Sequence, residues 1–134
     1  MAMIIVKTGK KEWTNRHETF TVPIDDLYNL GNATTESILN DYNTSTSGVQ
    51  KIISEAIAGK KRLRSLGCEL SWTKIAATNG ILLNTKALNL SFHVNTDSVH
   101  ANYQGTSDDL YFAQCGVSVQ ELSERLRKRN RSLK

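Results

Sequence analysis

The sequence predicts an α/β (α+β) fold: a small mixed sheet with helices on one side. Two segments carry capping boxes followed by apolar residues at helical spacing, which predicts two helices. Between them lie four short segments separated by turn residues, a pattern typical of strands. The resulting order of helix, strand, loop, three strands and helix favours helices packed against one face of a sheet.

The first helix is predicted to begin at Ser47, because Gln50 three residues later completes an S-x-x-Q capping box. We expect it to end at Gly59, in the left-handed conformation that glycine favours. The residues before it, 29–47, are rich in Asn, Thr and Ser and predict a long surface connection. The apolar stripe of the helix consists of Val49, Ile52, Ile53, Ala56 and Ile57.

The second helix is predicted to begin at Ser118, where Glu121 completes another capping box. The candidate strands between the helices are residues 62–66, 81–84, 99–103 and 110–114, with turns at Asn79-Gly80 and at Ser107-Asp108-Asp109. We therefore divide the chain into an N-terminal extension and surface connection, 1–46, and a folded unit, 47–134. The apolar stripe of the second helix is Val119, Leu122 and Leu126.

Composition limits the classes of function. At 134 residues, with 39% apolar and 22% charged residues, the chain is typical of one soluble globular domain. It has no run of about 18 apolar residues, so no membrane span is predicted. The N-terminus lacks the order of a secretory signal, so we expect a cytoplasmic protein by default. Cys68, Cys115 and three scattered histidines match no metal-ligand spacing, and no metal site is predicted.

The net charge of +4 is concentrated at the C-terminus, where six basic residues fall within the last eleven positions. Nucleic-acid binding would favour basic residues interleaved with aromatic ones, and the nearest aromatic residues, such as Phe112, lie upstream. Basic residues are also favourable at the C-terminal end of a helix. We therefore interpret this run as a solvated helix end and predict no nucleic-acid partner.

Residues 60–90 carry the chemistry that the sequence suggests. A basic strand leads into Gly67, which is followed by a short loop to Ser71. A glycine at the end of a strand lets the chain turn so that consecutive N–H groups face an anion, and a serine adds a hydroxyl donor. The pattern therefore predicts a pyrophosphate-binding loop, although many strand–glycine–loop segments bind no ligand.

Several separated blocks of the sequence resemble one family. They are W-x-N from Trp13, V-Q-x-I-I-x-x-A from Val49, L-G-x-x-x-S-W from Leu66, I-A-x-T-x-G-I-L-L-N-T from Ile75 and Q-C-G-V-S-V-Q-E-L from Gln114. Their order over residues 12–133 resembles the FAD-binding (PCMH-type) domain of the vanillyl-alcohol oxidase superfamily. The most similar members are the sugar-lactone and alditol oxidases. The resemblance implies that the folded unit is the first subdomain of such a domain.

The resemblance also implies a set of cofactor-binding residues. In the family, backbone N–H groups and a serine hydroxyl of the corresponding loop wrap the FAD pyrophosphate. Trp72 either packs behind the loop or contacts the cofactor, and the segment before the second helix passes near the flavin. By this resemblance the residues that bind FAD are Gly67, Cys68, Glu69, Leu70, Ser71, Trp72, Gly116 and Val117.

The loop departs from the family pattern at two positions. Leu70 stands where the family often has the histidine that bonds covalently to the flavin, so we expect non-covalent FAD at this loop. Glu69 adds a carboxylate, and repulsion from a pyrophosphate charge at about 5 Å amounts to roughly 3 kcal/mol at an effective dielectric near 20. Either Glu69 points to solvent or the chain holds FAD weakly.

The predicted function follows from the resemblance. It implies the FAD-binding portion of a flavin-dependent oxidoreductase that acts on alcohol groups of a sugar, sugar lactone or polyol. The second subdomain and the cap domain would be absent, so we assign no catalytic residue and expect this chain alone to be inactive. Its partners would be the remainder of the flavin domain and a cap domain, in cis or in trans. The alternatives are a non-catalytic remnant acting as an interaction module and, third, a basic nucleic-acid-binding domain.

Overall fold

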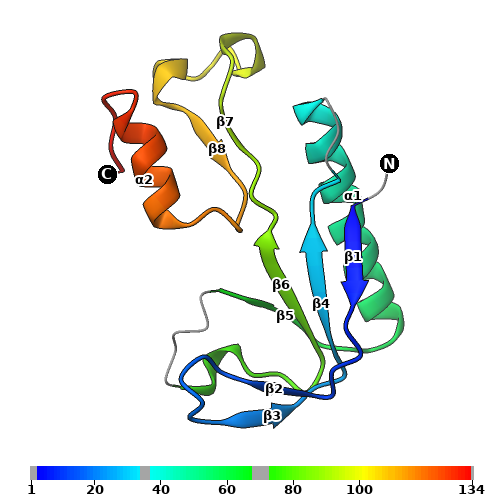
Figure 1. Ribbon diagram of the computed structural model, residues 1–134. Coiled ribbons are helices and arrows are strands. Elements are labelled where there is room, and N and C mark those ends of the chain that lie inside the picture. The colour runs from blue at the N-terminus through cyan, green and yellow to red at the C-terminus, as the bar shows by residue number, and fades with distance from the viewer. Residues whose placement is uncertain (1–2, 34–36, 68–72, 134) are drawn as a thin grey trace.

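The computed structural model describes residues 3–33, 37–67 and 73–133, and its centre is a four-stranded sheet (Figure 1). The strand order is β1-β4-β6-β5, with β1 antiparallel to β4 and the other three strands parallel. The sheet is therefore mixed, as predicted. Its strands are β1 (Ile4–Lys7), β4 (Asp26–Gly31), β6 (Ile81–Ala87) and β5 (Leu63–Leu66).

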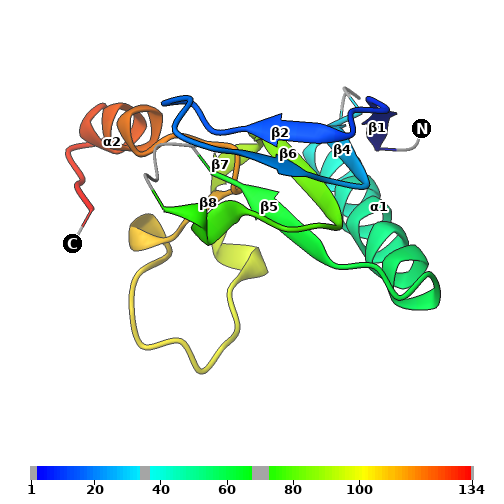
Figure 2. The same cartoon turned by 90° about the horizontal axis from the view of Figure 1, so that it is seen from below.

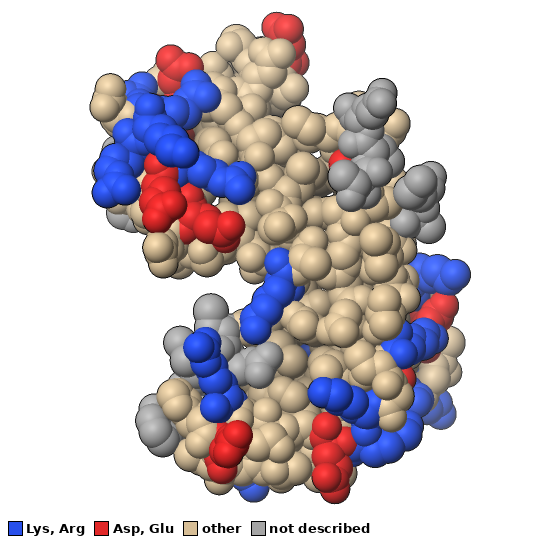
Figure 3. Space-filling view, in the orientation of Figure 1, with Lys and Arg blue, Asp and Glu red and all other residues tan. Residues whose placement is uncertain are grey.

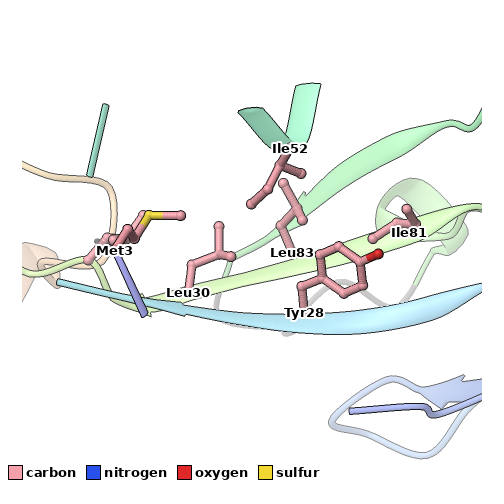
Figure 4. Close-up of a cluster of buried hydrophobic side chains, with 7 residues drawn as sticks. Met3, Tyr28, Leu30, Ile52, Ile81 and Leu83 are labelled. Atoms are coloured by element: carbon pink, nitrogen blue, oxygen red, sulfur yellow. The ribbon is translucent and has the colours of Figure 1, made fainter. Parts of the chain in front are cut away.

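One face of the sheet is covered by α1 (Ile38–Ala58), which connects β4 to β5. Strand side chains alternate between the two faces, so Tyr28 and Leu30 of β4 point to the same side as Ile81 and Leu83 of β6. In Figure 4 these side chains point towards Ile52, which comes from the helix above them. The burial of this cluster holds α1 on the sheet. Met3 and Leu88 complete it.

The opposite face is covered in part by a hairpin of β2 (Glu12–Thr14) and β3 (Thr21–Pro23). Figure 2 shows the hairpin and α1 on opposite sides of β4 and β6. Beneath the hairpin, Leu82 of β6 is fully buried. The cluster on this face consists of Trp13, Ile24, Leu27, Leu66 and Leu82.

The C-terminal part of the chain forms a smaller unit beyond the end of β6. It contains the antiparallel pair β7 (Ser91–His93) and β8 (Tyr111–Ala113) and the helix α2 (Val119–Arg127). Three short 3₁₀ turns also occur: η1 (Lys74–Ala76), η2 (Thr96–Ser98) and η3 (Ser107–Asp109). Figure 2 shows the segment between η2 and η3 extending away from the rest of the molecule.

The predictions for α2 and for three strands are confirmed. Ser118 caps α2, and its hydroxyl accepts from the Glu121 N–H while the Glu121 carboxylate accepts from the Ser118 N–H. Strands β5, β6 and β8 overlap the predicted segments 62–66, 81–84 and 110–114. The strand predicted at 99–103 is wrong, because this segment forms a turn in which the Tyr103 N–H donates to the His100 carbonyl.

The predicted start of the first helix is wrong by about three turns. The helix begins at Ile38 after the N-cap Ser37, so Ser47 lies inside it. The hydroxyls of Thr44 and Thr46 donate to carbonyls four residues earlier, which lets these polar residues be part of the helix.

The predicted surface connection at 29–47 is also wrong. Residues 29–31 belong to β4, and the remainder of the segment contains the start of α1. The predicted boundary between 46 and 47 falls inside that helix, and β1 and β4 belong to the same sheet as β5 and β6. Residues 1–46 therefore contribute strands to the central sheet rather than an extension.

The end of α1 differs from the prediction by one residue. Gly59 has a φ of −82°, and Lys60 takes the left-handed conformation with a φ of 51°. The Lys60 N–H donates to the Ile57 carbonyl and the Lys61 N–H to the Ala56 carbonyl. This hydrogen-bond pattern is the Schellman motif, which places the left-handed residue one position after the C-cap.

Candidate functional site

The candidate site lies at the end of the sheet where the parallel strands β4, β5 and β6 finish. In open α/β sheets, ligands bind outside the carboxyl ends of the strands. Gly67 directly follows β5 at this end, and the last residue of β5, Leu66, pairs with Asn84 of β6. Gly67 is exposed, and a Cβ added there would meet no atom within 4 Å. Its φ is not left-handed either, so nothing in the described chain requires a glycine here.

The remaining loop residues lie outside the described residues. These are Cys68, Glu69, Leu70, Ser71 and Trp72. Their contacts with a pyrophosphate stay predictions. On the far side of the loop, η1 is joined to β5 by a hydrogen bond from the Arg64 guanidinium to the Ile75 carbonyl.

Gly116 and Val117 have a structural role that the sequence did not reveal. The Gly116 N–H donates to the Leu88 carbonyl at 2.8 Å, and the Val117 N–H donates to the Gln114 carbonyl at 3.1 Å. A Cβ at position 116 would lie 2.4 to 2.7 Å from the carbonyl oxygens of Thr85, Lys86 and Leu88. Glycine therefore allows this segment to lie directly against the end of β6. Since both N–H groups are engaged, these residues can contact a cofactor only through other atoms.

Gly67 and Gly116, far apart in sequence, both adjoin the last part of β6. Gly67 follows the strand that pairs with β6, and Gly116 packs against the last residues of β6. Because adjacent strands lie about 4.8 Å apart, the end of β5 is a close neighbour of β6. In Figure 3 the surface is hollowed between the α2 region and the region below it, and Lys and Arg side chains border the hollow.

The β5–η1–β6 region is strongly basic. Between residues 56 and 96 the sequence contains six Lys and Arg residues and a single acidic residue, Glu69. Among the described residues, Lys61 alone of the six forms an ion pair, with Asp25 at 3.2 Å. Lys60, Lys61 and Arg62 precede β5 and lie at the opposite end of the sheet, whereas Lys86 lies near the end of β6, where its charge favours an anionic ligand. The six residues are Lys60, Lys61, Arg62, Arg64, Lys74 and Lys86.

The N-terminus of α2 is closed by its own side chain. The pKa of Glu121 is held below its ordinary value, first by the hydrogen bond from the Ser118 backbone N–H and then by the Ser118 hydroxyl, with a smaller effect of Arg125. The carboxylate therefore occupies the position where a phosphate could meet the positive end of the helix dipole. The N-terminus of α2 is therefore not free to bind an anion.

A second concave region, of about 580 Å³, lies where β4 and β6 finish. The sequence did not indicate this region, because Asn29 falls in the segment predicted as a surface connection. The Arg125 guanidinium reaches across from α2 and donates to the Ser91 hydroxyl. The lining is mixed, and includes Ile4, Val6, Asn29, Ala87, Ser91 and Arg125.

Gln114 joins the C-terminal unit to the sheet. Its Oε1 accepts from the Asn32 side chain at 2.9 Å and from the Leu90 N–H at 2.8 Å. The Asn32 Oδ1 in turn accepts from the Ser45 hydroxyl at 2.6 Å. These bonds link β4, α1, the start of β7 and the end of β8, and so fix the position of Gly116.

Residues 3–33, 37–67 and 73–133 contain no group of three or more His, Cys, Asp or Glu side chains that could hold a metal ion. Within the same ranges, no helix combines the length and the apolar character needed to cross a membrane.

Comparison with known proteins establishes the fold. The sequence matches no protein-family model and no curated protein. Among solved structures, it matches the cholesterol oxidase from B. sterolicum with a TM-score of 0.56 at 17% identity, over 95% of this chain and 20% of that chain. A histidine-to-alanine mutant of the Brevibacterium sterolicum enzyme matches with a TM-score of 0.57 at 16% identity, over the same shares of the two chains.

At these identities the likeness concerns the fold. The chain is a mixed α/β unit with a small mixed sheet and two helices, and it has the fold of part of an oxidase. It spans about a fifth of the length of the structures that it matches.

Proposed function

We propose that this chain is the FAD-binding portion of a flavin-dependent oxidoreductase with a PCMH-type domain. Two independent comparisons support the proposal. The sequence motifs resemble the vanillyl-alcohol oxidase superfamily, and the fold resembles part of an oxidase whose substrate, cholesterol, is also an alcohol. The observation that carries the proposal is that the motif residues Gly67 and Gly116 both adjoin the end of β6.

The described residues fit FAD by their chemistry. The dinucleotide carries a diphosphate, and the end of the sheet combines an open surface at Gly67 with the exposed Lys86, which has no ion pair among the described residues. The chain would hold the cofactor without a covalent bond at this loop, through the segment 67–72 and the charge near the end of β6. Bound flavin would supply the redox chemistry by accepting a hydride from an alcohol carbon at N5.

The motif resemblance also supports a class of substrate. The motifs resemble sugar-lactone and alditol oxidases, which supports a sugar, sugar lactone or polyol. We propose an alcohol group as the site of oxidation, because the motif relatives and the structural matches share that chemistry. The substrate pocket would come from the remainder of the flavin domain and a cap domain, in cis or in trans, with no nucleic acid involved.

The test is a direct measurement of flavin binding. The purified chain would be examined for flavin absorbance and then titrated with FAD by calorimetry, with riboflavin as the ligand that lacks phosphate. We expect FAD to bind more tightly than riboflavin, since only FAD carries the diphosphate that the loop after β5 is proposed to bind. A folded, colourless chain that ignores FAD would overturn the proposal and favour the non-catalytic interaction module.

A further inference from the structure

Lys86 lies between the two segments that the proposed function assigns to the cofactor. It is the sixth residue of β6, two positions after Asn84, which pairs with the last residue of β5. Strand β6 therefore continues beyond the last residue that pairs with β5. On its other side, the Lys86 carbonyl oxygen lies 2.7 Å from where a Cβ of Gly116 would be.

The backbone at Lys86 is irregular. Asn29 of β4 pairs with Asn84 of β6, whereas Gly31 pairs with Ala87, so β6 has one residue more than β4 in this interval. The Lys86 N–H donates to the Asn84 Oδ1 at 3.2 Å. Bulges of this kind redirect side chains and are common beside active sites. The Lys86 side chain is exposed at this bulge.

Other positive groups near this end of the sheet already have partners within the chain. Arg64 donates to the Ile75 carbonyl, and the Lys74 ammonium lies 6.0 Å from the centre of the Phe20 ring. The N-terminus of α2 is capped by Glu121. Among the described residues Lys86 has no ion pair. Its ammonium therefore remains available to a ligand.

We propose that the Lys86 ammonium binds the diphosphate of the dinucleotide. This inference rests on the proposed function. Lysine binds phosphate as a compact point charge on a flexible stem. Lys86 is exposed and lies in β6 between the residue paired with the end of β5 and the residues that contact Gly116, which puts its charge beside the proposed site.

The experiment compares Lys86→Met with Lys51→Met, a matched control on α1 at the opposite face of the sheet. Each variant and the parent chain would be titrated with FAD, ADP and riboflavin at low and high salt. We expect Lys86→Met to weaken FAD and ADP binding about ten- to a hundredfold, as is typical for losing one charged hydrogen bond. Riboflavin binding should not change, and the salt dependence of FAD binding should decrease. Lys86→Arg should retain most of the affinity.

The outcomes separate the two proposals. If the parent chain binds no FAD, the proposed function fails. If it binds FAD and Lys86→Met binds FAD as tightly as the parent, only the role of Lys86 is overturned. An equal loss of riboflavin and FAD binding would also overturn it, because it would indicate a structural defect. Circular dichroism would verify the fold of each variant, and Lys86→Gln would replace Lys86→Met if that variant did not fold.

Discussion

At position 116 the chain passes so close to β6 that a side chain has no room. The obstacles are backbone carbonyl oxygens of Thr85, Lys86 and Leu88, which cannot rotate away as a flexible side chain would. Gly67 belongs to the same sequence resemblance but has open space around it. Two glycines of one motif set therefore have different physical roles.

We expect Gly116→Ala to destabilise the protein by about 2 kcal/mol or more, because the added methyl group overpacks against fixed carbonyls. Gly67→Ala is the matched control and should change the free energy of unfolding by no more than about 1 kcal/mol. Urea unfolding followed by circular dichroism measures both. Equal stability of the two variants would contradict the close packing at 116.

Residues of the W-x-N motif support the fold. Trp13 is buried under the hairpin and contacts the Phe20 ring edge-to-face at 5.8 Å. The Asn15 Oδ1 accepts from the N–H groups of Thr19 and Phe20, which closes the turn between β2 and β3. The motif resemblance at these positions therefore reflects the architecture of the hairpin.

Among the elements, α2 is stabilised at its start by a reciprocal pair of hydrogen bonds. These bonds hold the pKa of Glu121 below its ordinary value of 4.5. A lowered pKa means that the folded state favours the carboxylate, so the stabilisation is complete above the ordinary pKa. It is lost as the pH falls below that value and through the lowered pKa.

We therefore expect the helix content of α2 to decrease on acidification below about pH 4.5 in the parent chain. Glu121→Gln should start with a less stable α2 at neutral pH and show a smaller change on acidification. Glu124→Gln, on the same helix, is the control and should behave as the parent does. Amide chemical shifts of residues 118–128 over a pH titration measure the effect, and identical titrations of all three proteins would refute it.

The connection between the C-terminal unit and the sheet depends on few side chains. Gln114 accepts two hydrogen bonds, and Phe112 of β8 contacts Tyr42 of α1 edge-to-face at 5.4 Å. The Phe112 ring also stacks on the Phe92 ring of β7, with 4.8 Å between the ring centres. This small junction determines how the segment 114–117 meets β6.

Gln114→Leu should destabilise the junction by about 1 to 2 kcal/mol, because the Leu90 N–H and the Asn32 amide lose their acceptor. Gln104→Leu is the matched control, since the Gln104 side chain is exposed and donates only to the Asn102 carbonyl. Hydrogen exchange of the Leu90 amide should become faster in Gln114→Leu and stay unchanged in Gln104→Leu. Unchanged exchange in both variants would show that Gln114 does not hold the junction.

On the scale of the whole molecule, the sheet separates two apolar clusters. Leu82 points into the cluster under the hairpin and is fully buried, whereas its neighbours Ile81 and Leu83 point towards α1. The upper part of the hairpin face is less well covered, since Ile4 and Val6 are about half exposed. The stability of the sheet therefore depends on both clusters.

Leu82→Ala should destabilise the protein by about 2 to 5 kcal/mol, because a fully buried leucine leaves a cavity. Leu39→Ala is the matched control, because Leu39 on α1 is 65% exposed, and its effect should stay within about 0.5 kcal/mol. Thermal unfolding of both variants distinguishes them. Similar midpoints would mean that the hairpin face contributes little to the stability of the sheet.

The fold class and several elements could be predicted from the sequence. The capping box at Ser118 and strands β5, β6 and β8 follow from signals within a few residues. The first ten residues of α1 could not be predicted, because Ser and Thr favour turns in isolation. In this helix they bond to carbonyls of the preceding turn. Strands β1 and β4 were missed because β4 pairs with β1 and β6, and this pairing with strands distant in sequence leaves no local pattern.

By itself the sequence determined the local features: the cap of α2, the alternation of the inner strands and the excess of positive charge around β5 and β6. Only the tertiary structure decided that β1 and β4 complete the sheet, that Gly116 lies against β6 and that Lys86 stands between the two predicted segments. The physical reason is distance along the chain. Caps and periodicity act within one or two turns, whereas strand pairing and the approach of Gly116 depend on contacts between residues far apart in sequence.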